Sequence, residues 1–339
     1  MTTSGTGTRD TRPVTDTPVG RRIARALALE PGGPPSAQAR LACQVVKAVV
    51  KGGWASIPDT DEGLLRFQRI TDAFSRVQTV PPGVALASED LGTCGAEWVR
   101  AGSPDERKVF LYLHGGAYFF GSPRLYRPST WRLSAATGRP VLALDYRRAP
   151  QHTPYDALDD AVAAYDFLLG NGYAPHDIVV GGDSAGGHLG LALLLALKRR
   201  GTGLPAAAVF LSPWVDFLCE ADSHRLNARS EAVIPPGKLA WLGRRFSEGA
   251  SEDDPLLAPR RAGASDLEGM PPMLLIASGG EILRDETREL AERSKAAGVR
   301  AVYQEWDGLM HVFTQFADFI PEGKAAFRHI AAFLRGSEA

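Results

Sequence analysis

Short, uninterrupted apolar segments alternate with longer helical patterns through most of this chain. The apolar segments lie at 109–113, 141–145, 178–182, 207–211, 273–277 and 301–305. Continuous apolar runs are typical of parallel strands that are buried on both faces. Helical patterns separate most of them, at 155–169, 185–200, 284–297 and 322–335. The alternation predicts an α/β fold with a mostly parallel central sheet and helices on both faces.

Two parts of the chain depart from this alternation. Residues 1–18 are rich in Thr, Gly and charge and lack periodicity, which predicts a disordered tail. Apolar residues recur at helical spacing in 38–50 and 62–77, so we expect two helices there. Residues 84–101 are expected to form two antiparallel edge strands. The stretch 213–250 places helical, Trp-containing sequence between two strands, and we interpret it as an insertion beside the N-terminal helices.

Composition excludes several classes of protein. The 339 residues include 38 Lys and Arg against 39 Asp and Glu, and a net charge of −1 argues against a nucleic-acid partner. The longest apolar run, 189–197, is far shorter than the roughly 20 residues of a membrane span. The N-terminus has no apolar secretory segment. Cys43, Cys94 and Cys219 are too dispersed for a disulfide framework or a cysteine-rich zinc site, so we expect a cytoplasmic protein.

The most specific motif is a G-x-S-x-G sequence at 182–186, between the apolar segment 178–182 and the helical pattern 185–200. A strand, a tight turn and a helix form the context in which such a serine acts as a nucleophile. The turn exposes the Oγ atom of Ser184, and the flanking glycines avoid collisions with neighbouring chain. A glycine-rich turn without chemistry is the alternative.

A second motif, His114-Gly115-Gly116-Ala117, follows the apolar segment 109–113. Small residues let backbone N–H groups approach a substrate oxygen, and such donors stabilise the oxyanion of an acyl-transfer reaction. We expect four backbone donors: Gly115, Gly116, Ala117 and Ala185. His114 precedes the serine in the chain, and we interpret it as a structural hydrogen-bonding residue.

A serine nucleophile requires a histidine base and an acid that orients it. With this nucleophile turn, the usual chain order is Ser, acid, His. His329 lies in a helical pattern and His224 precedes the expected acid, so we choose His311, in the loop after the last apolar segment.

The acid is expected where the chain leaves the apolar segment 273–277. Glu281 is our choice, because it lies close to the end of that segment. Asp285 is an alternative that also suits the start of a helix, where a carboxylate complements the dipole. Asp307 is the second alternative.

Together these motifs resemble the hormone-sensitive-lipase-like (family IV) carboxylesterases of the α/β-hydrolase superfamily, over residues 84–335. The similar segments are His114-Gly115-Gly116-Ala117-Tyr118, the run 145–152 (D-Y-R-R-A-P-Q-H), the nucleophile motif 182–187 and the run 281–286. Three positions depart from the family pattern. Ala117 replaces a glycine, Glu281 stands where Asp is usual, and His188 stands where Asn is common; we expect His188 to satisfy a local hydrogen bond.

The resemblance implies an α/β-hydrolase fold with a helical cap. Residues 1–83 would then supply the tail and an N-terminal cap, and 84–339 the catalytic domain, with 213–250 as a cap insertion. The expected pocket residues are Tyr118, Phe119, Phe120 and Trp214; Trp54 fits the pocket or the core equally well.

We therefore expect a serine carboxylesterase that hydrolyses short- to medium-chain acyl esters through an acyl-enzyme. An acetyl ester or lactone of a small metabolite would fit, and neither a metal nor an organic cofactor is expected. The alternative is use of the same pocket without hydrolysis, by a cyclase, an isomerase or a small-molecule-binding protein. A homodimer remains open, because dimerisation is common on this fold.

Overall fold

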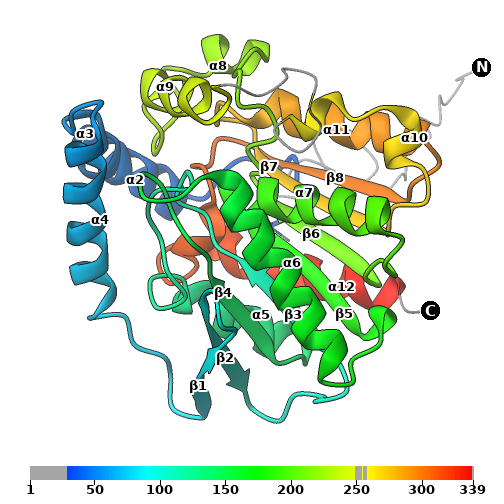
Figure 1. The fold of residues 1–339 in the computed structure, drawn as a ribbon. Helices are drawn as coiled ribbons and strands as arrows, with labels where there is room; N and C mark the ends of the chain where they lie inside the picture. Colours follow the sequence, from blue (N-terminus) through cyan, green and yellow to red (C-terminus); the bar gives the residue numbers. More distant parts are fainter. Residues whose placement is uncertain (1–28, 249–253, 255–257, 338–339) are drawn as a thin grey trace, which may run out of the picture.

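The computed structural model describes residues 29–248, 254 and 258–337. Eight strands form one sheet in the order β1-β2-β4-β3-β5-β6-β7-β8 (Figure 1). The strands are β1 (Val84–Asp90), β2 (Gly95–Ala101), β3 (Val109–Leu113), β4 (Val141–Asp145), β5 (Ile178–Asp183), β6 (Ala207–Leu211), β7 (Met273–Ser278) and β8 (Ala301–Trp306). β2 is antiparallel to β1 and β4, and the other neighbours are parallel. The six expected strands and the antiparallel edge pair are thereby confirmed.

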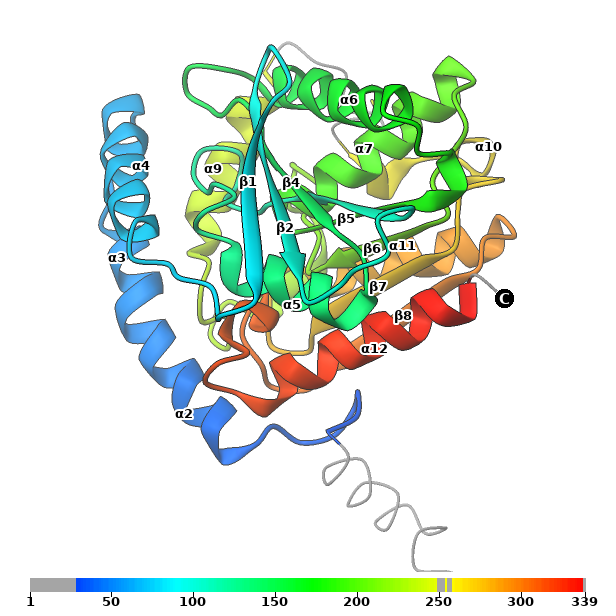
Figure 2. The ribbon, with the colours of Figure 1, turned by 90° about the horizontal axis from the view of Figure 1, so that it is seen from below.

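Helices cover both faces of the sheet, as the alternation predicts. Those that pack on the sheet or follow its strands are α5 (Arg127–Thr137), α6 (Pro154–Gly170), α7 (Ala185–Arg200), α10 (Ala264–Leu267), α11 (Arg284–Ala296) and α12 (Pro321–Ser337), with short turns η3 (Pro175–Asp177), η4 (Pro259–Arg261) and η5 (Phe313–Phe316). Figure 2 shows α5 and α12 on one face and α6 and α7 on the other. Side chains of β3 alternate accordingly: Leu111 packs in the same cluster as α6 and α7, and Tyr112 in the cluster of α12.

The carboxyl ends of the parallel strands meet at one edge of the sheet. Asp183 at the end of β5 pairs with Leu211 of β6, and Ser278 at the end of β7 pairs with Trp306 of β8. Ligands of open α/β sheets bind beyond this edge. The segments that follow β5, β7 and β8 carry Ser184, Glu281 and His311, so the fold brings all three to the same place.

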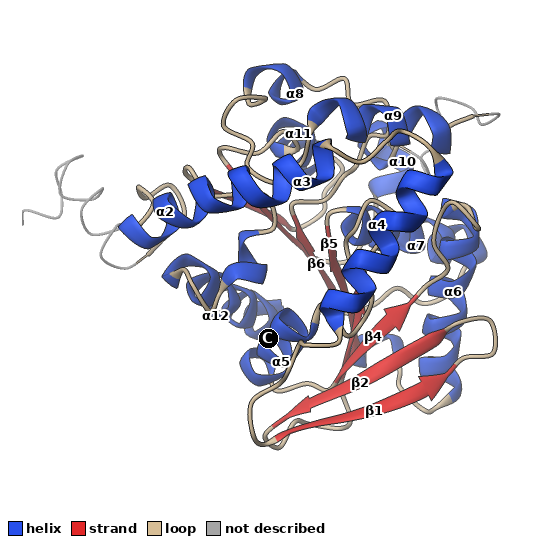
Figure 3. Ribbon diagram, turned by 90° about the vertical axis from the view of Figure 1, so that its left-hand side faces the viewer, coloured by secondary structure: helices blue, strands red, loops and turns tan. Residues whose placement is uncertain are grey.

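The N-terminal helices lie along one side of the sheet domain (Figure 3). They are α2 (Ala37–Val46), the short π-helical η2 (Lys47–Lys51), α3 (Gly52–Ala55) and α4 (Asp61–Ser75). The side chains of Ser36 and Thr60 cap α2 and α4. The helical path runs on through Gly52. The expected apolar face of the first helix is only partly covered, because Leu41 is exposed while Val46 is buried.

The stretch between β6 and β7 begins with α8 (Asp222–Leu226) and α9 (Pro236–Phe246). It contacts the N-terminal helices: Lys51 Nζ donates to the carbonyl of Glu231 at 2.9 Å, and Arg245 pairs with Asp61 at 2.5 Å. That the two parts together act as a cap stays a prediction. The expected tail, 1–18, lies outside the described residues. Among the described helices, none has the length and apolarity that crossing a membrane requires.

Candidate active site

Ser184 occupies a strained turn between β5 and α7. Its backbone angles, φ 53° and ψ −122°, are rarely adopted by a residue with a side chain, and only 6% of its surface is exposed. A Cβ on Gly182 would lie 2.4 Å from the carbonyl oxygen of Leu113, and one on Gly186 would lie 2.0 Å from the same atom. The turn is therefore pressed against the end of β3, and both glycines of the motif are required for that close approach.

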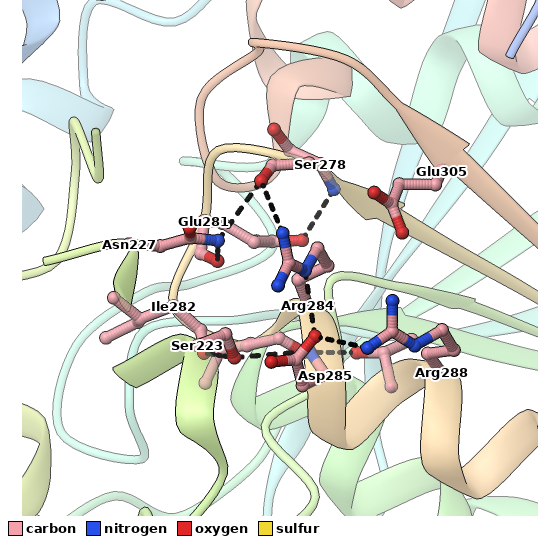
Figure 4. A network of polar contacts seen from close by, with 12 residues as sticks. Ser223, Asn227, Ser278, Glu281, Ile282, Arg284, Asp285, Arg288 and Glu305 are labelled. Carbon is pink, nitrogen blue, oxygen red and sulfur yellow. Dashed lines mark hydrogen bonds and ion pairs between the residues drawn. The ribbon is translucent and has the colours of Figure 1, made fainter. Parts of the chain in front are cut away.

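His311 and Glu281 form a buried hydrogen-bonded pair. His311 Nδ1 lies 2.6 Å from Glu281 Oε2, and Glu281 Oε1 accepts the backbone N–H of Ser278 at 2.7 Å. The carboxylate of Asp285 instead pairs with two arginines at the start of α11, Arg284 at 2.8 Å and Arg288 at 2.7 Å (Figure 4). Of the acids considered from sequence, Glu281 is the one hydrogen bonded to His311.

The protonation of this pair depends on burial and on mutual attraction. Burial raises the pKa of Glu281, although its hydrogen bond with His311 works in the opposite direction. Burial alone would lower the pKa of His311, but the hydrogen bond and charge of Glu281 outweigh it, with help from Glu231 and Asp183, and the pKa is raised. The site therefore stabilises an imidazolium, the form that a general base reaches after it accepts a proton.

The other candidate histidines have different partners. Burial lowers the pKa of His114 to about 3, so this residue is neutral, and its Nδ1 lies 2.7 Å from the carbonyl oxygen of Gly115. His224 lies 3.1 Å from Glu286, and His329 lies 3.1 Å from Glu30. His188 Nδ1 is hydrogen bonded to the Tyr118 hydroxyl at 2.7 Å, a local contact as expected.

The backbone donors expected from sequence do not all remain available. Gly116 and Ala117 line the same cavity as Ser184. Ala185 is the first residue of α7, so its N–H has no partner within the helix. The N–H of Gly115, however, already donates to Asp183 Oδ1 at 3.1 Å. Gly115 is therefore wrong as an oxyanion donor, and three of the four expected donors remain.

A cavity of about 160 Å³ opens over Ser184 and His311. Its walls are mainly apolar and are formed by Val50, Trp54, Phe120, Val233, Ile234, Leu239, Val312 and Phe316. The described side chains of Ser184 and His311 form no hydrogen bond with each other; such catalytic hydrogen bonds are often long until substrate binds. A larger polar depression of about 440 Å³ lies beside α4 and β2, and its lining includes none of the predicted catalytic residues.

The aromatic residues expected in the pocket divide into two groups. Phe120 lines the cavity, as does Trp54. Tyr118, Phe119 and Trp214 do not line it and are fully buried in the core instead. Packing explains the correction: the Tyr118 hydroxyl is used by His188, and Trp214 Nε1 donates to the carbonyl of Asp216 at 2.9 Å.

Sequence reasoning missed the aliphatic walls of the cavity. Val50 comes from the N-terminal helices, whereas Val233, Ile234 and Leu239 come from the stretch between β6 and β7. Aliphatic side chains carry no motif. The only available indication was their position in the two segments that were expected to fold over the sheet.

Comparisons with known proteins agree with this geometry. Residues 110–315 match a family described by the alpha/beta hydrolase fold. An acetyl-hydrolase of Streptomyces hygroscopicus is 37% identical over 293 residues, which cover 86% of this chain and 95% of that protein. An esterase of Acinetobacter venetianus is 30% identical over 265 residues, covering 78% and 86% of the two chains.

The fold of this chain also resembles solved structures of esterases. A crystal structure of an esterase from the bacterial hormone-sensitive lipase family superposes with a TM-score of 0.82 and 35% identity, over 90% of this chain and all of that one. The structure of EstE5 soaked with ethyl alcohol gives a TM-score of 0.82 and 32% identity, over 89% and 99% of the two chains. This chain therefore belongs to the hormone-sensitive-lipase-like carboxylesterases of the α/β-hydrolase fold.

Proposed function

We propose that this carboxylesterase hydrolyses short- to medium-chain acyl esters of small molecules through an acyl-enzyme on Ser184. Ser184 Oγ attacks the carbonyl carbon while His311 takes its proton, and His311 then returns that proton to the departing alcohol. Glu281 holds the imidazole in place. Water, activated by the same histidine, then attacks the acyl-enzyme and releases the carboxylic acid.

The N–H groups of Gly116, Ala117 and Ala185 hold the oxyanion that forms in each half of this reaction. Fixed donors aimed at developing charge lower the barrier, and removal of one costs about 2.7–4 kcal/mol in a measured protease case. The observation that carries the proposal is the buried His311–Glu281 pair, whose histidine lines the same cavity as the strained Ser184.

The acyl group is proposed to be short because the cavity is small and lined mainly by apolar side chains. At about 160 Å³ it is below the size of most drug-binding pockets. The Streptomyces hygroscopicus relative is an acetyl-hydrolase, which supports an acetyl ester as the substrate of this chain.

The test is hydrolysis of p-nitrophenyl esters from acetyl to dodecanoyl by wild type, Ser184→Ala and the control Ser265→Ala. Ser265 is exposed on α10. We expect turnover to peak at short or medium chains, to persist in the control and to fall on the order of 10⁴- to 10⁶-fold in Ser184→Ala. Folded wild type without turnover of any ester in the series would contradict the proposal and favour non-hydrolytic use of the pocket.

A cytoplasmic location and a homodimer are also proposed. Cys43, Cys94 and Cys219 are all free thiols, which suits a reducing compartment. Light scattering coupled to size-exclusion chromatography decides the assembly: a mass near that of one 36.3 kDa chain would contradict the dimer.

A further inference from the structure

A second buried carboxylate lies beside the acid of the proposed triad. Glu231 follows α8 in the stretch between β6 and β7, and only 1% of its surface is exposed. Removing a carboxylate from water is unfavourable by several kcal/mol unless hydrogen bonds replace the lost hydration. The partners of Glu231 therefore indicate what the residue does.

The carboxylate of Glu231 joins two segments of the site. Its Oε2 accepts the backbone N–H of Ile282 at 3.0 Å, and Ile282 directly follows Glu281. Its Oε1 accepts the N–H groups of Val233 at 2.7 Å and of Ile234 at 3.1 Å, two residues that line the cavity. One side chain thus fixes the acid-bearing turn, 279–282, against a wall of the cavity.

Neighbouring side chains strengthen the same connection. Asn227 Nδ2 donates to the carbonyl of Glu281 at 2.8 Å, and the Ser223 hydroxyl donates to the carbonyl of Ile282 at 2.5 Å (Figure 4). The Ser230 hydroxyl donates to the carbonyl of Gly280 at 2.9 Å. These donors reach the carbonyls of the turn, whereas Glu231 reaches one of its N–H groups.

We propose that Glu231 is a positioning residue that sets Glu281, and through it His311, against the cavity wall formed by Val233 and Ile234. The inference rests on the proposed function, since it assigns Glu231 a part in that same reaction. Glu231 also acts through its charge, which favours the protonated form of His311.

Among the described residues, charged groups face this region from four segments. The Cys43 thiol of α2 also faces Glu231, and burial raises its pKa to about 11. Glu281 and Asp183 act on His311 from the ends of β7 and β5, together with Glu231 itself. Lys51 of η2 faces Glu231 from the N-terminal helices and donates to its backbone carbonyl. Removal of the Glu231 charge leaves the charges of Glu281, Asp183 and Lys51 in place. It should therefore lower the pKa of His311.

The variants that test the proposal are Glu231→Gln, Glu231→Asp and the control Asp222→Asn. Gln retains an acceptor for Val233 and Ile234 but leaves the Ile282 N–H without a carboxylate. Asp retains the charge on a shorter side chain. Asp222 carries an exposed carboxylate on α8 that pairs with the exposed Arg225, so its removal should change nothing.

We expect kcat/KM for p-nitrophenyl acetate to fall about tenfold to a hundredfold in Glu231→Gln, because small misplacements of reacting groups have effects of this size. The acid limb of the pH profile should move to lower pH in Glu231→Gln and return toward wild type in Glu231→Asp. If Glu231 contributes only to stability, Glu231→Gln should have a lower melting temperature and an unchanged acid limb in its pH profile.

The outcomes distinguish the positioning role of Glu231 from the proposed esterase function. Wild-type kcat/KM and an unshifted acid limb in folded Glu231→Gln would overturn the positioning role alone. Loss of folding in Glu231→Gln transfers the decision to Glu231→Asp, whose shorter side chain cannot keep all three hydrogen bonds of Glu231. A lowered kcat/KM in folded Glu231→Asp then supports the positioning role, and a wild-type kcat/KM overturns it. Wild type without any ester turnover would overturn the proposed function together with this inference.

Discussion

The carboxylate of Asp183 accepts the backbone N–H of Gly115 at 3.1 Å and the hydroxyl of Tyr112 at 2.5 Å. The residue before the nucleophile therefore holds the loop that carries the proposed oxyanion donors. Burial raises the pKa of Asp183 to about 6, although the hydrogen bonds that it accepts oppose this rise. Because Gly115 is held in this way, the next two N–H groups along the loop, those of Gly116 and Ala117, are positioned at the cavity.

Substitution of Asp183 should affect the rate more than substrate binding. In Asp183→Ala the Gly115 N–H loses its acceptor and the donor loop loosens, so kcat should fall about 10²- to 10³-fold, the size of an oxyanion-hole defect. KM should change little, because these donors act mainly in the transition state. Asp183→Asn retains one acceptor oxygen and should lose less. An increased KM with wild-type kcat would contradict this account.

The choice of Glu281 over Asp285 leads to a matched pair of variants. Glu281→Gln should lower kcat about 10⁴-fold, as loss of the orienting carboxylate does in a serine protease. Glu281→Asp retains the charge but withdraws it from His311 by one methylene, so its loss should be intermediate. Asp285→Asn should retain turnover, since Asp285 pairs with Arg284 and Arg288. Equal losses in Glu281→Gln and Asp285→Asn would show that the acid is wrongly assigned.

The raised pKa of His311 sets the acid side of the pH profile. Only neutral imidazole accepts the proton of Ser184, so kcat/KM should fall as the pH decreases through the pKa of His311 in the free enzyme. Since that pKa lies above the ordinary value of 6.5, the half-maximal point should lie above pH 6.5. Glu281→Gln should move it downward. A wild-type midpoint below pH 6.5 would contradict the prediction.

The buried carboxylate of Glu286 should make the stability of the protein depend on pH. Burial raises the pKa of Glu286 to about 7, from an ordinary value of 4.5, against the opposing hydrogen bonds from His224 and the Val215 N–H. The folded state then binds more protons than the unfolded state, so the contribution of Glu286 to stability is complete below pH 4.5 and is lost as pH rises through about 7. A tenfold difference in proton affinity between the folded and unfolded states corresponds to about 1.4 kcal/mol.

Unfolding by urea at pH 5 and pH 8 measures this dependence. The free energy of unfolding should decrease between the two pH values by more in wild type than in Glu286→Gln, which cannot titrate at this position. Glu220, an exposed carboxylate between β6 and β7, provides the control Glu220→Gln. An identical pH dependence in wild type and Glu286→Gln would contradict the raised pKa.

The sheet and the nucleophile turn could be predicted because their causes are local. Strands buried on both faces must be continuously apolar, and a serine turn pressed against β3 tolerates only glycine at 182 and 186. The choice of His311 also followed from local features, since the end of a strand and the chain order limited the candidates. The hydrogen bond between His311 and Glu281 could be established only from the structure, because it joins residues 30 apart in sequence.

The wrong predictions concern groups whose hydrogen-bond partners lie in distant parts of the chain. The Gly115 N–H is taken by Asp183, 68 residues away, and the hydroxyl of Tyr118 is taken by His188, 70 residues away. A sequence motif gives the type of residue at such a position but not its partner. Glu231 was missed for the same reason, because its contact with Ile282 spans 51 residues.

Phe120 lines the cavity whereas Trp214 is buried in the core, so truncation of the two side chains should have different effects. Phe120 lines the cavity and packs against Phe67 with ring centroids 5.1 Å apart, so Phe120→Ala should enlarge the cavity and shift the preferred ester toward longer acyl chains. Trp214 is 0% exposed and does not line the cavity, so Trp214→Ala should reduce stability by about 3–5 kcal/mol without a shift in chain preference.

Both properties can be measured on the same samples, by urea unfolding and by the ester series from acetyl to dodecanoyl. Phe120→Ala has the smaller expected effect on stability because its ring is only partly buried. A changed chain preference in Trp214→Ala with wild-type stability would return Trp214 to the pocket wall and contradict its assignment to the core. An unchanged preference in Phe120→Ala would mean that the acyl chain occupies another side of the cavity, such as the wall of Val233 and Ile234.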